Sequence, residues 1–345
     1  MENVLPKISL MIHTASIDSF LINQGIGSYF TALIDCLNHQ SFKQFELVYI
    51  DTYHDKNQEL FSNLISKSKF TIKHVPVHKD HRYWYDLGYT YISAAKNTGI
   101  LYADGELLVT CDDGEFFPEN LLQKYWDHYS TGCYLLPLHK RMRSINVENN
   151  LPIYPLNGDV YINDHRHNFG PDIICHQHGS WAYAGTSFSL KDALILNGFN
   201  ERMDGCKSLE DCEFGIRLTL LGKQFSCDKE AFLYILDHKS YGDVPPYEEV
   251  IGPDFFKDKK KITNFIAVEN YGSYMCAVEL LELKANRLPL VQKHFDIIKR
   301  ETLHYRGFDP FAPDNKEKMD IWLQVPCFDL KKQRDELRKS GDWKW

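Results

Sequence analysis

Two pairs of adjacent acidic residues stand where carboxylates can take part in chemistry. Asp112 and Asp113 follow the apolar run ELLVTC, and Glu210 and Asp211 open the periodic segment SLEDCEFGIRLTLLG. Carboxylates at the end of a strand suit a hard divalent cation, because Mg²⁺ and Mn²⁺ prefer oxygen ligands. Acids in the first turn of a helix are held in the ionised form by the helix dipole, and an ionised carboxylate can act as a general base. We therefore predict a metal site at the first pair and a base at the second.

Each pair also has a purely structural explanation. Acidic residues that follow a strand are common turn formers. Ser208 and Asp211 have the spacing of a capping box, in which the Ser208 hydroxyl accepts a hydrogen bond from the backbone N–H of Asp211. A cap requires only one acid, so the presence of Glu210 beside Asp211 favours the functional interpretation.

Apolar segments of strand length alternate with helical patterns in the first third of the chain. This alternation predicts an α/β fold with a mostly parallel central sheet and helices on both faces. In such a sheet a ligand binds at the carboxyl ends of the strands, where Asp51 and the pair Asp112 and Asp113 are expected to lie. The predicted strands are 7–13, 45–51, 70–77 and 106–113. The predicted helices are 28–40, a segment containing Leu60, Leu64 and Ile65, and 90–105, which Gly105 closes.

The rest of the chain predicts three further features. Pro118 is expected at the first position of a helix, which proline favours. Residues 131–180 are rich in proline and glycine, which predicts loops or short strands. A helix is predicted over 208–222 and a strand over 231–238. We expect one domain over 1–240 and a C-terminal helical extension over 241–345, with helical segments at 274–288 and 291–303.

Composition excludes several classes of protein. The hydrophobic fraction of 43% and the charged fraction of 25% are ordinary for a globular chain of 345 residues. A net charge of -8 argues against binding to nucleic acid. No apolar stretch reaches the ~18 residues of a membrane span, and the nine cysteines show no C-x-x-C pair, so we expect reduced thiols and a cytoplasmic location. The basic segment KKQRDELRKSGDWKW predicts either a solvated terminal helix or peripheral contact with a membrane or a partner.

Two sequence blocks together resemble a known family. The first block is AAKNTGILYADGELLVTCDDGEFFPENLL. The second block is GTSFSLKDALILNGFNERM together with LEDCEFGIRLTLLG. Both blocks come after the predicted strands ISLMIHTA and FELVYID. This order resembles the family 2 glycosyltransferases of the GT-A fold, a Rossmann-like architecture, over roughly residues 7 to 240. The resemblance implies an inverting enzyme that transfers a sugar from a nucleotide-sugar donor, expected to be a UDP-sugar, to a hydroxyl of a glycan or glycoconjugate.

The resemblance also implies roles for individual residues. Asp211 matches the catalytic base of the family and Glu210 its acidic neighbour. Thr14 and Asp51 match positions that hold the nucleoside base, and Lys96 stands where relatives have an arginine facing the donor. Asp113 matches the last acid of the D-x-D motif and is the expected ligand of Mn²⁺ or Mg²⁺, and Asp112 is assigned to donor binding. His238, which follows the apolar run AFLYILD, is a second candidate metal ligand, and Trp181 is a candidate acceptor-side residue that could stack on a sugar.

Departures from the family pattern leave alternatives open. HTA replaces the usual P-T-Y after the first strand, and Cys111 falls where the first acid of the metal motif is expected. Either Asp112 substitutes for that acid or Glu115 joins the site. The histidine pairs at 165–167 and 176–178 have a zinc-like spacing but no acid or cysteine at a matching distance, which favours acceptor-loop residues or plain surface.

Two other functions are compatible with an α/β nucleotide-binding domain. A sugar-nucleotide pyrophosphorylase normally carries a Gly-rich, Arg-containing loop after its first strand, whereas this chain has only Gly25 and Gly27 there and no nearby arginine. A non-catalytic scaffold that binds a nucleotide sugar is the other alternative, because fold alone does not determine function.

Overall fold

The computed structural model describes the parts of the chain that form the central domain and one C-terminal helix. The described residues are 5–14, 29–86, 91–112, 114–149, 151–161, 164, 173–176, 182, 184–201, 204, 210–236, 325–326 and 328–341. The predicted boundary at 240/241 and the predicted helical segments at 274–288 and 291–303 lie outside these residues.

A five-stranded, mostly parallel sheet forms the centre of the molecule. The strand order is β12-β4-β1-β2-β3, in which only β12 runs antiparallel, against β4. The parallel pairing brings Thr14 beside Asp51 and Ile12 beside Cys111, so the ends of three strands meet at one edge. The strands are β1 (Ile8–Thr14), β2 (Phe45–Asp51), β3 (Thr71–Pro76), β4 (Leu107–Cys111) and β12 (Ser187–Ser189), and they confirm the four strands predicted from the sequence.

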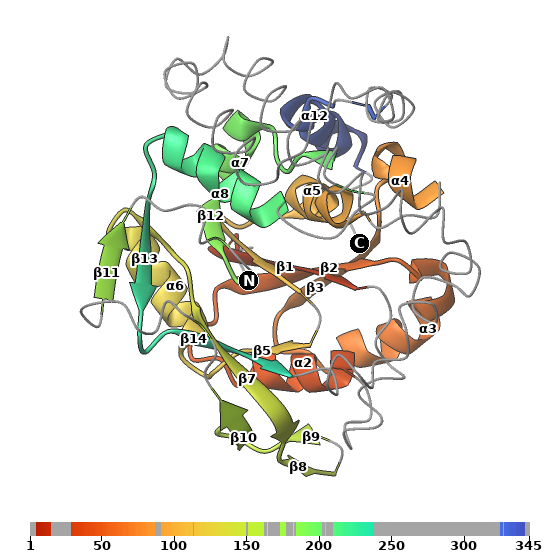
Figure 1. The fold of residues 1–345 in the computed structure, drawn as a ribbon. Helices are drawn as coiled ribbons and strands as arrows, with labels where there is room; N and C mark the ends of the chain where they lie inside the picture. The colour runs from red at the N-terminus through yellow and green to blue at the C-terminus, as the bar shows by residue number, and fades with distance from the viewer. Residues whose placement is uncertain are drawn as a thin grey trace, which may run out of the picture.

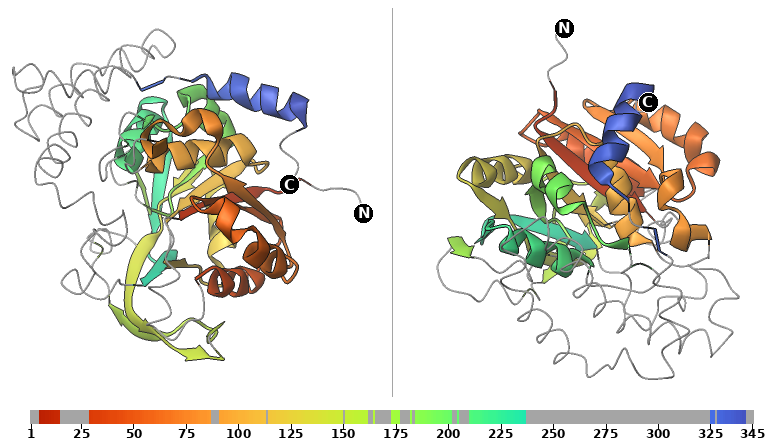
Figure 2. Two further views of the ribbon diagram at one scale, coloured as in Figure 1. Left: turned by 90° about the vertical axis from the view of Figure 1, so that its right-hand side faces the viewer. Right: turned by 90° about the horizontal axis from the view of Figure 1, so that it is seen from above.

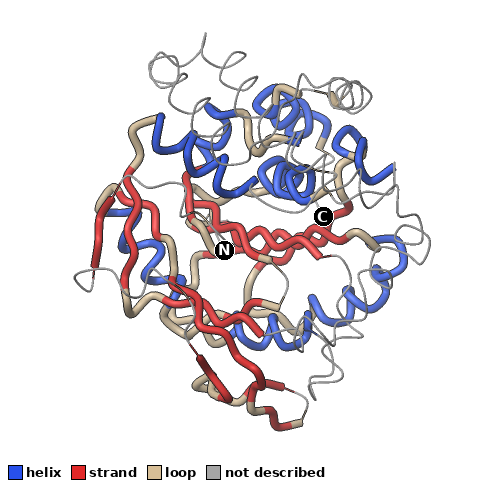
Figure 3. Tube along the Cα trace, in the orientation of Figure 1, coloured by secondary structure: helices blue, strands red, loops and turns tan. Residues whose placement is uncertain are grey.

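Helices cover both faces of this sheet, as Figures 1 and 3 show. On one face lie α4 (Tyr83–Asp86), α5 (Ile92–Tyr102), α7 (Leu190–Leu196), α8 (Glu210–Leu220) and α12 (Leu330–Ser340). On the other face lie α2 (Tyr29–Asn38) and α3 (His54–Ile65). The short 3-10 helix η1 (Lys79–His81) precedes α4, and α6 (Leu121–Ser130) packs against β6 (Cys133–Leu135).

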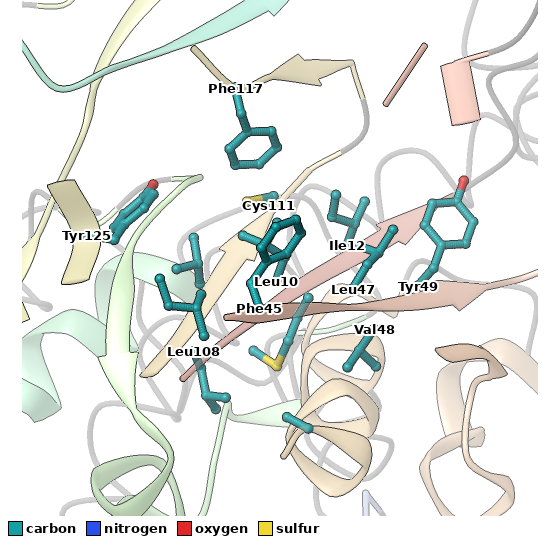
Figure 4. Close-up of a cluster of buried hydrophobic side chains, with 14 of the residues drawn as sticks. Leu10, Ile12, Phe45, Leu47, Val48, Tyr49, Leu108, Cys111, Phe117 and Tyr125 are labelled. Atoms are coloured by element: carbon teal, nitrogen blue, oxygen red, sulfur yellow. The ribbon is translucent and has the colours of Figure 1, made fainter. Parts of the chain in front are cut away.

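The core sits between these layers because the central strands are apolar on both faces. All seven residues of β2 are buried, as are all five of β4. In Figure 4 Leu10 and Leu47 lie on the face toward Phe117, and Val48 points to the opposite face. Burial on both faces is why these strands read as continuous apolar runs in the sequence and not as alternating patterns.

Three smaller sheets lie beside the central one. The largest has the order β10-β7-β14-β5, and it contains β5 (Glu115–Phe116), β7 (Leu138–Ile145), β10 (Gly158–Tyr161) and β14 (Phe232–Leu236). A second sheet pairs β11 (Ile173–His176), β13 (Gln224–Asp228) and β6, and a third pairs β8 (Val147–Glu148) with β9 (Leu151–Pro152). The pairing of β5 with β14 connects the segment after Asp112 to the second strand after α8.

Two predicted helix boundaries are wrong. Gly105 does not close α5, which ends at Tyr102 with Ala103 as its C-cap. A Cβ at Gly105 would lie 2.4 Å from the backbone nitrogen of Ser9, so the glycine is required by close approach to β1. Pro118 does not start α6, because the helix begins at Leu121 with Asn120 as its N-cap, and Pro118 supplies only the carbonyl that bonds to the Leu121 N–H.

The C-terminal helix α12 packs on the same layer as α5 and α7, as the two views in Figure 2 show. Leu330 and Leu337 are buried, and Asp329 caps the helix by accepting a hydrogen bond from the Lys332 N–H at 3.0 Å. The predicted terminal helix is therefore present, but one of its faces is packed and not solvated. No helix in the described part of the chain has both the length and the apolarity needed to cross a membrane.

Candidate functional site

The carboxyl ends of β1 and β4 bring Thr14, His13 and Asp112 to one edge of the central sheet. Asp112 directly follows β4, and the parallel register places it beside His13 of β1. The two side chains approach to 3.8 Å between His13 Nε2 and Asp112 Oδ1. The Asp112 side chain remains 49% exposed, so its carboxylate is accessible at this edge. The topology therefore places this predicted donor-binding acid where a ligand binds in α/β proteins.

A buried ion pair connects this edge to the second acidic pair. Lys96 lies in the middle of α5, and its Nζ is 2.8 Å from Oε1 of Glu210, the first residue of α8. Only 3% of the Lys96 side chain and 8% of the Glu210 side chain are exposed. Lys96, which the family resemblance places facing the donor, thus contacts the acidic neighbour of the predicted base.

Three carboxylates from the two acidic segments act on this one ammonium group. Burial lowers the pKa of Lys96, but the carboxylates of Glu210, Asp112 and Asp211 outweigh burial and raise it above its ordinary value. Lys96 is therefore permanently charged. Asp211 is half-buried in the first turn of α8, whereas Glu210 is buried, so Asp211 is the more accessible of the two. Asp112 therefore belongs to the same cluster as Glu210 and Asp211, although it lies far from them in the sequence.

His13 belongs to this cluster, although the sequence motifs did not select it. Burial lowers the pKa of His13 below its ordinary value, and the Lys96 ammonium lowers it further, against the opposing effects of Asp112 and Glu210. The imidazole is therefore neutral at neutral pH, with ring nitrogens that can donate or accept a hydrogen bond. The available signal was its position directly before Thr14, where this sequence departs from the family pattern.

A buried carboxylate fixes the start of α5. Asp204 accepts hydrogen bonds from the backbone N–H groups of Ser93 at 2.6 Å and Ala94 at 2.8 Å, and thereby caps the helix that carries Lys96. Burial raises the pKa of Asp204 well above its ordinary value, and the nearby Glu201 carboxylate adds to this effect. Sequence spacing could not find this cap, because Asp204 lies more than a hundred residues after the helix that it caps.

A second group of hydrogen bonds joins α5 to the NGF segment at 197–199. The Asn97 side chain accepts from the Phe199 N–H at 2.7 Å and donates to the Phe199 carbonyl at 2.9 Å. The same amide donates to Glu201 Oε1 at 2.7 Å, and Glu201 also contacts Nδ1 of the buried His81. The residues between α7 and α8 are thus attached directly to the helix that carries Lys96.

The described residues of the acidic motif after β4 differ in how far their side chains are buried. Cys111, in place of the expected first acid, is fully buried. Burial, then the carboxylates of Glu115 and Asp112, raises the pKa of its thiol well above the ordinary value, so the thiol is protonated. Glu115 is 1% exposed and lies beside Cys111, away from solvent. Asp112 is therefore the acid of this motif whose carboxylate is accessible among the described residues.

Asp51 lies at the expected strand end, and its carboxylate bonds to groups of the protein itself. Its oxygens accept hydrogen bonds from the Tyr53 N–H at 2.7 Å and the Asn57 amide at 2.9 Å, and contact His74 Nε2 at 2.8 Å. Burial opposes ionisation, but these hydrogen bonds lower the pKa of Asp51 below its ordinary value. The turn-forming role is therefore present, and contact with the donor base stays a prediction.

The accessible acid fits a divalent cation only in part. Asp112 offers a hard oxygen ligand, and Mg²⁺ sites in nucleotide enzymes commonly use one or two protein carboxylates while substrate phosphates supply other ligands. Among the residues that the structure describes, no group of three or more His, Cys, Asp or Glu side chains is arranged to hold a metal ion. Asp113, His238 and Trp181, together with the histidine pair at 165–167, lie outside the described residues.

The fold is similar to that of a solved glycosyltransferase. No model of a known protein family matches the sequence, and no curated protein is significantly similar to it. Residues 1–349 of S. aureus TarS, a GT-A glycosyltransferase, match 92% of this chain and 78% of that chain with a TM-score of 0.51 and 14% sequence identity. The same part of TarS in complex with UDP-GlcNAc matches 92% of this chain and 79% of that chain, with a TM-score of 0.50 and 16% identity. The predicted α/β fold of the GT-A type, with a mostly parallel central sheet, is therefore confirmed.

Proposed function

We propose that this chain is an inverting glycosyltransferase that moves a sugar from a UDP-sugar to a hydroxyl group of a glycan or glycoconjugate. The observation that carries the proposal is the gathering of Glu210, Asp211 and Asp112 around Lys96 at the carboxyl edge of a GT-A sheet. A UDP-sugar is the favoured donor because a TarS structure of the same fold contains UDP-GlcNAc.

In this proposal each member of the cluster has a separate role. Asp211 takes the proton from the acceptor hydroxyl, whose oxygen forms a bond to the anomeric carbon as the bond from that carbon to the diphosphate oxygen breaks. Glu210 is too buried to reach an acceptor, and its ion pair with Lys96 fixes the first turn of α8 and therefore the position of Asp211. Attack on the face opposite the leaving group inverts the configuration of the anomeric carbon.

A divalent cation is the proposed cofactor. Asp112 and Asp113 would hold Mn²⁺ or Mg²⁺, with His238 as a further candidate ligand, and the ion would neutralise the charge of the departing nucleoside diphosphate. The neutral imidazole of His13, next to Asp112, can donate a hydrogen bond to the same diphosphate. Thr14 and Asp51 are the proposed contacts of the nucleoside base, and Trp181 the proposed contact of the acceptor sugar.

The first experiment measures donor binding and donor breakdown together. Thermal-shift curves of the full chain with UDP-, GDP-, CMP- and dTDP-sugars, each with and without Mn²⁺, identify the base and test the metal requirement, because a ligand that binds the folded state raises the melting temperature. We expect stabilisation by a UDP-sugar in the presence of Mn²⁺ and slow release of UDP to water as the acceptor. EDTA should abolish both effects.

The outcomes separate the proposed enzyme from its alternatives. Stabilisation without any release of UDP, with or without candidate glycan acceptors, would favour a nucleotide-sugar-binding scaffold. Formation of a UDP-sugar from UTP and a sugar phosphate would favour a pyrophosphorylase. Absence of binding to every nucleotide sugar would contradict the proposal.

A further inference from the structure

The basic helix α12 caps the carboxyl end of α5. The last carbonyls of a helix have no partner within the helix, and a positive charge near them is favourable. Nη1 of Arg334 donates to the carbonyls of Ile100 at 2.8 Å and Leu101 at 2.7 Å, and Nη2 donates to the Ala103 carbonyl. The Arg338 guanidinium donates to the Ala103 carbonyl at 3.1 Å. The two arginines thus bond to several of the carbonyls at this end of α5, and the Tyr102 carbonyl accepts a hydrogen bond from Lys73 at 2.8 Å.

The start of α12 is attached to the segment between α7 and α8. The Asn197 side chain donates to the Phe328 carbonyl at 2.6 Å and accepts from the Leu330 N–H at 2.8 Å. Gly198 has a φ of +68°, and a Cβ there would lie 2.2 Å from both Leu330 Cδ1 and Asn97 Oδ1. A glycine at this position therefore lets α12, α5 and this segment meet.

A third contact passes through a buried histidine. His81 Nε2 is 3.1 Å from Gln333 Oε1, while Nδ1 of the same ring contacts Glu201. Glu201 in turn accepts a hydrogen bond from Asn97, the neighbour of Lys96 on α5. Three separate contacts thus connect α12 to the helix and to the segment that flank the Lys96–Glu210 ion pair.

We propose that α12 is a positioning element of the active site. Arg334 caps α5 at its carboxyl end, and Asp204 caps the same helix at its start. Arg334 thereby holds α5 in the position where the Lys96 ammonium meets Glu210. The effect that this inference predicts on kcat rests on the proposed function. Arg334 and Arg338 are assigned an internal contact with α5, whereas Lys331 and Lys332 remain exposed.

The test compares Arg334→Met with Lys331→Met in the full chain. Both substitutions remove one positive charge from α12, but Lys331 is exposed and only Arg334 contacts α5. UDP release from the donor identified by the thermal-shift screen is followed with Mn²⁺, at a temperature where circular dichroism shows each variant to be folded. Arg334→Met should lower kcat roughly 10- to 100-fold with little change in the KM for the donor, because a small displacement of a catalytic group is costly. Lys331→Met should leave both constants unchanged.

Hydrogen exchange provides the second measurement. Arg334→Met should lose protection in the amides of α5 while the amides of β1 and β2 keep theirs, whereas a general loss of stability would affect all three elements. Arg334→Lys, which keeps the charge but not the forked contact, should lie between the wild type and Arg334→Met, and it replaces the methionine variant if that variant does not fold.

The results decide the inference separately from the proposed function. An unchanged kcat in a folded Arg334 variant, or equal losses in the Arg334 and Lys331 variants, would overturn the positioning role. If the wild type releases no UDP from any donor, the proposed function fails. The exchange data alone then decide whether α12 holds α5, and unchanged protection of α5 in the Arg334 variants would overturn that role.

Discussion

The two edges of the central sheet both carry buried charges, and they differ in how completely those charges are enclosed. At the amino edge Lys73 Nζ lies 2.7 Å from Glu46 Oε2 and 2.7 Å from Asp104 Oδ2, and it donates to the Tyr102 carbonyl at 2.8 Å. Glu46 also accepts a hydrogen bond from the Ser9 hydroxyl at 2.6 Å. At the carboxyl edge the charges gather around Lys96, where Asp112 is 49% exposed and Asp211 half-buried.

Enclosure therefore distinguishes the two clusters better than the kinds of residue do. Both contain a lysine and several carboxylates, and each lysine makes an ion pair at hydrogen-bonding distance. Taking an ion out of water is unfavourable, so a cluster without a ligand function is expected to satisfy each charge within the protein, as the amino edge does. Carboxylates left accessible beside a buried ammonium, at the edge where α/β proteins bind ligands, point to chemistry.

The largest effect is expected from Lys96→Met, which removes the charge at the centre of the accessible cluster. Glu210 would remain buried without its ion-pair partner, and breaking a buried pair in this way costs about 3–5 kcal/mol of stability. Displacement of the first turn of α8 should also abolish UDP release. Urea unfolding and donor turnover measure the two effects, and Lys96→Arg, which keeps the charge, should retain more of both. A Lys96→Met variant with wild-type turnover would contradict the role given to this ion pair.

Lys73→Met breaks the corresponding pair at the enclosed edge. We expect a loss of stability of similar size, about 3–5 kcal/mol, because Glu46 loses its buried cation. Donor turnover per folded molecule should stay close to the wild-type value, because the proposed donor and acceptor groups lie at the opposite edge and Arg334 and Arg338 still bond to the end of α5. Turnover is measured below the melting temperature with the folded fraction determined by circular dichroism. A selective loss of kcat would show that the two edges are not functionally distinct.

Asp51→Asn tests an enclosed carboxylate at the carboxyl edge and should have the smallest effect. The pKa of Asp51 in the folded protein lies below its ordinary value of 3.8. Its ionised form therefore stabilises the fold above that value, and this contribution is lost as the pH falls through the folded-state pKa. The variant should be less stable than the wild type at neutral pH, and the difference should shrink on acidification below about pH 4. Urea midpoints across this range measure it, and a difference that does not change with pH would argue against the hydrogen-bonded role.

The sequence predicted those parts of the molecule that depend on local pattern. Buried parallel strands appear as apolar runs, and the acids at their ends follow directly from the topology, so β1, β2, β4 and the position of Asp112 could be anticipated. The convergence of Asp112 and Glu210 on Lys96 could be inferred only through the family resemblance. Asp204 and the capping of α5 by Arg334 had no local signal, because each depends on segments far apart in the chain. For His13 the signal was its place directly before Thr14, where the sequence departs from the family pattern.

The central claim is that Asp211 is the base and that the rest of the cluster holds it in place. Asp211→Asn keeps the size of the side chain and removes its ability to take a proton. Turnover of the UDP-sugar with Mn²⁺ should fall by roughly 100- to 10,000-fold, the usual contribution of a general base. Calorimetry should show the same affinity for the donor as in the wild type. Retained turnover would contradict the claim, and so would a loss of donor affinity large enough to account for the loss of turnover.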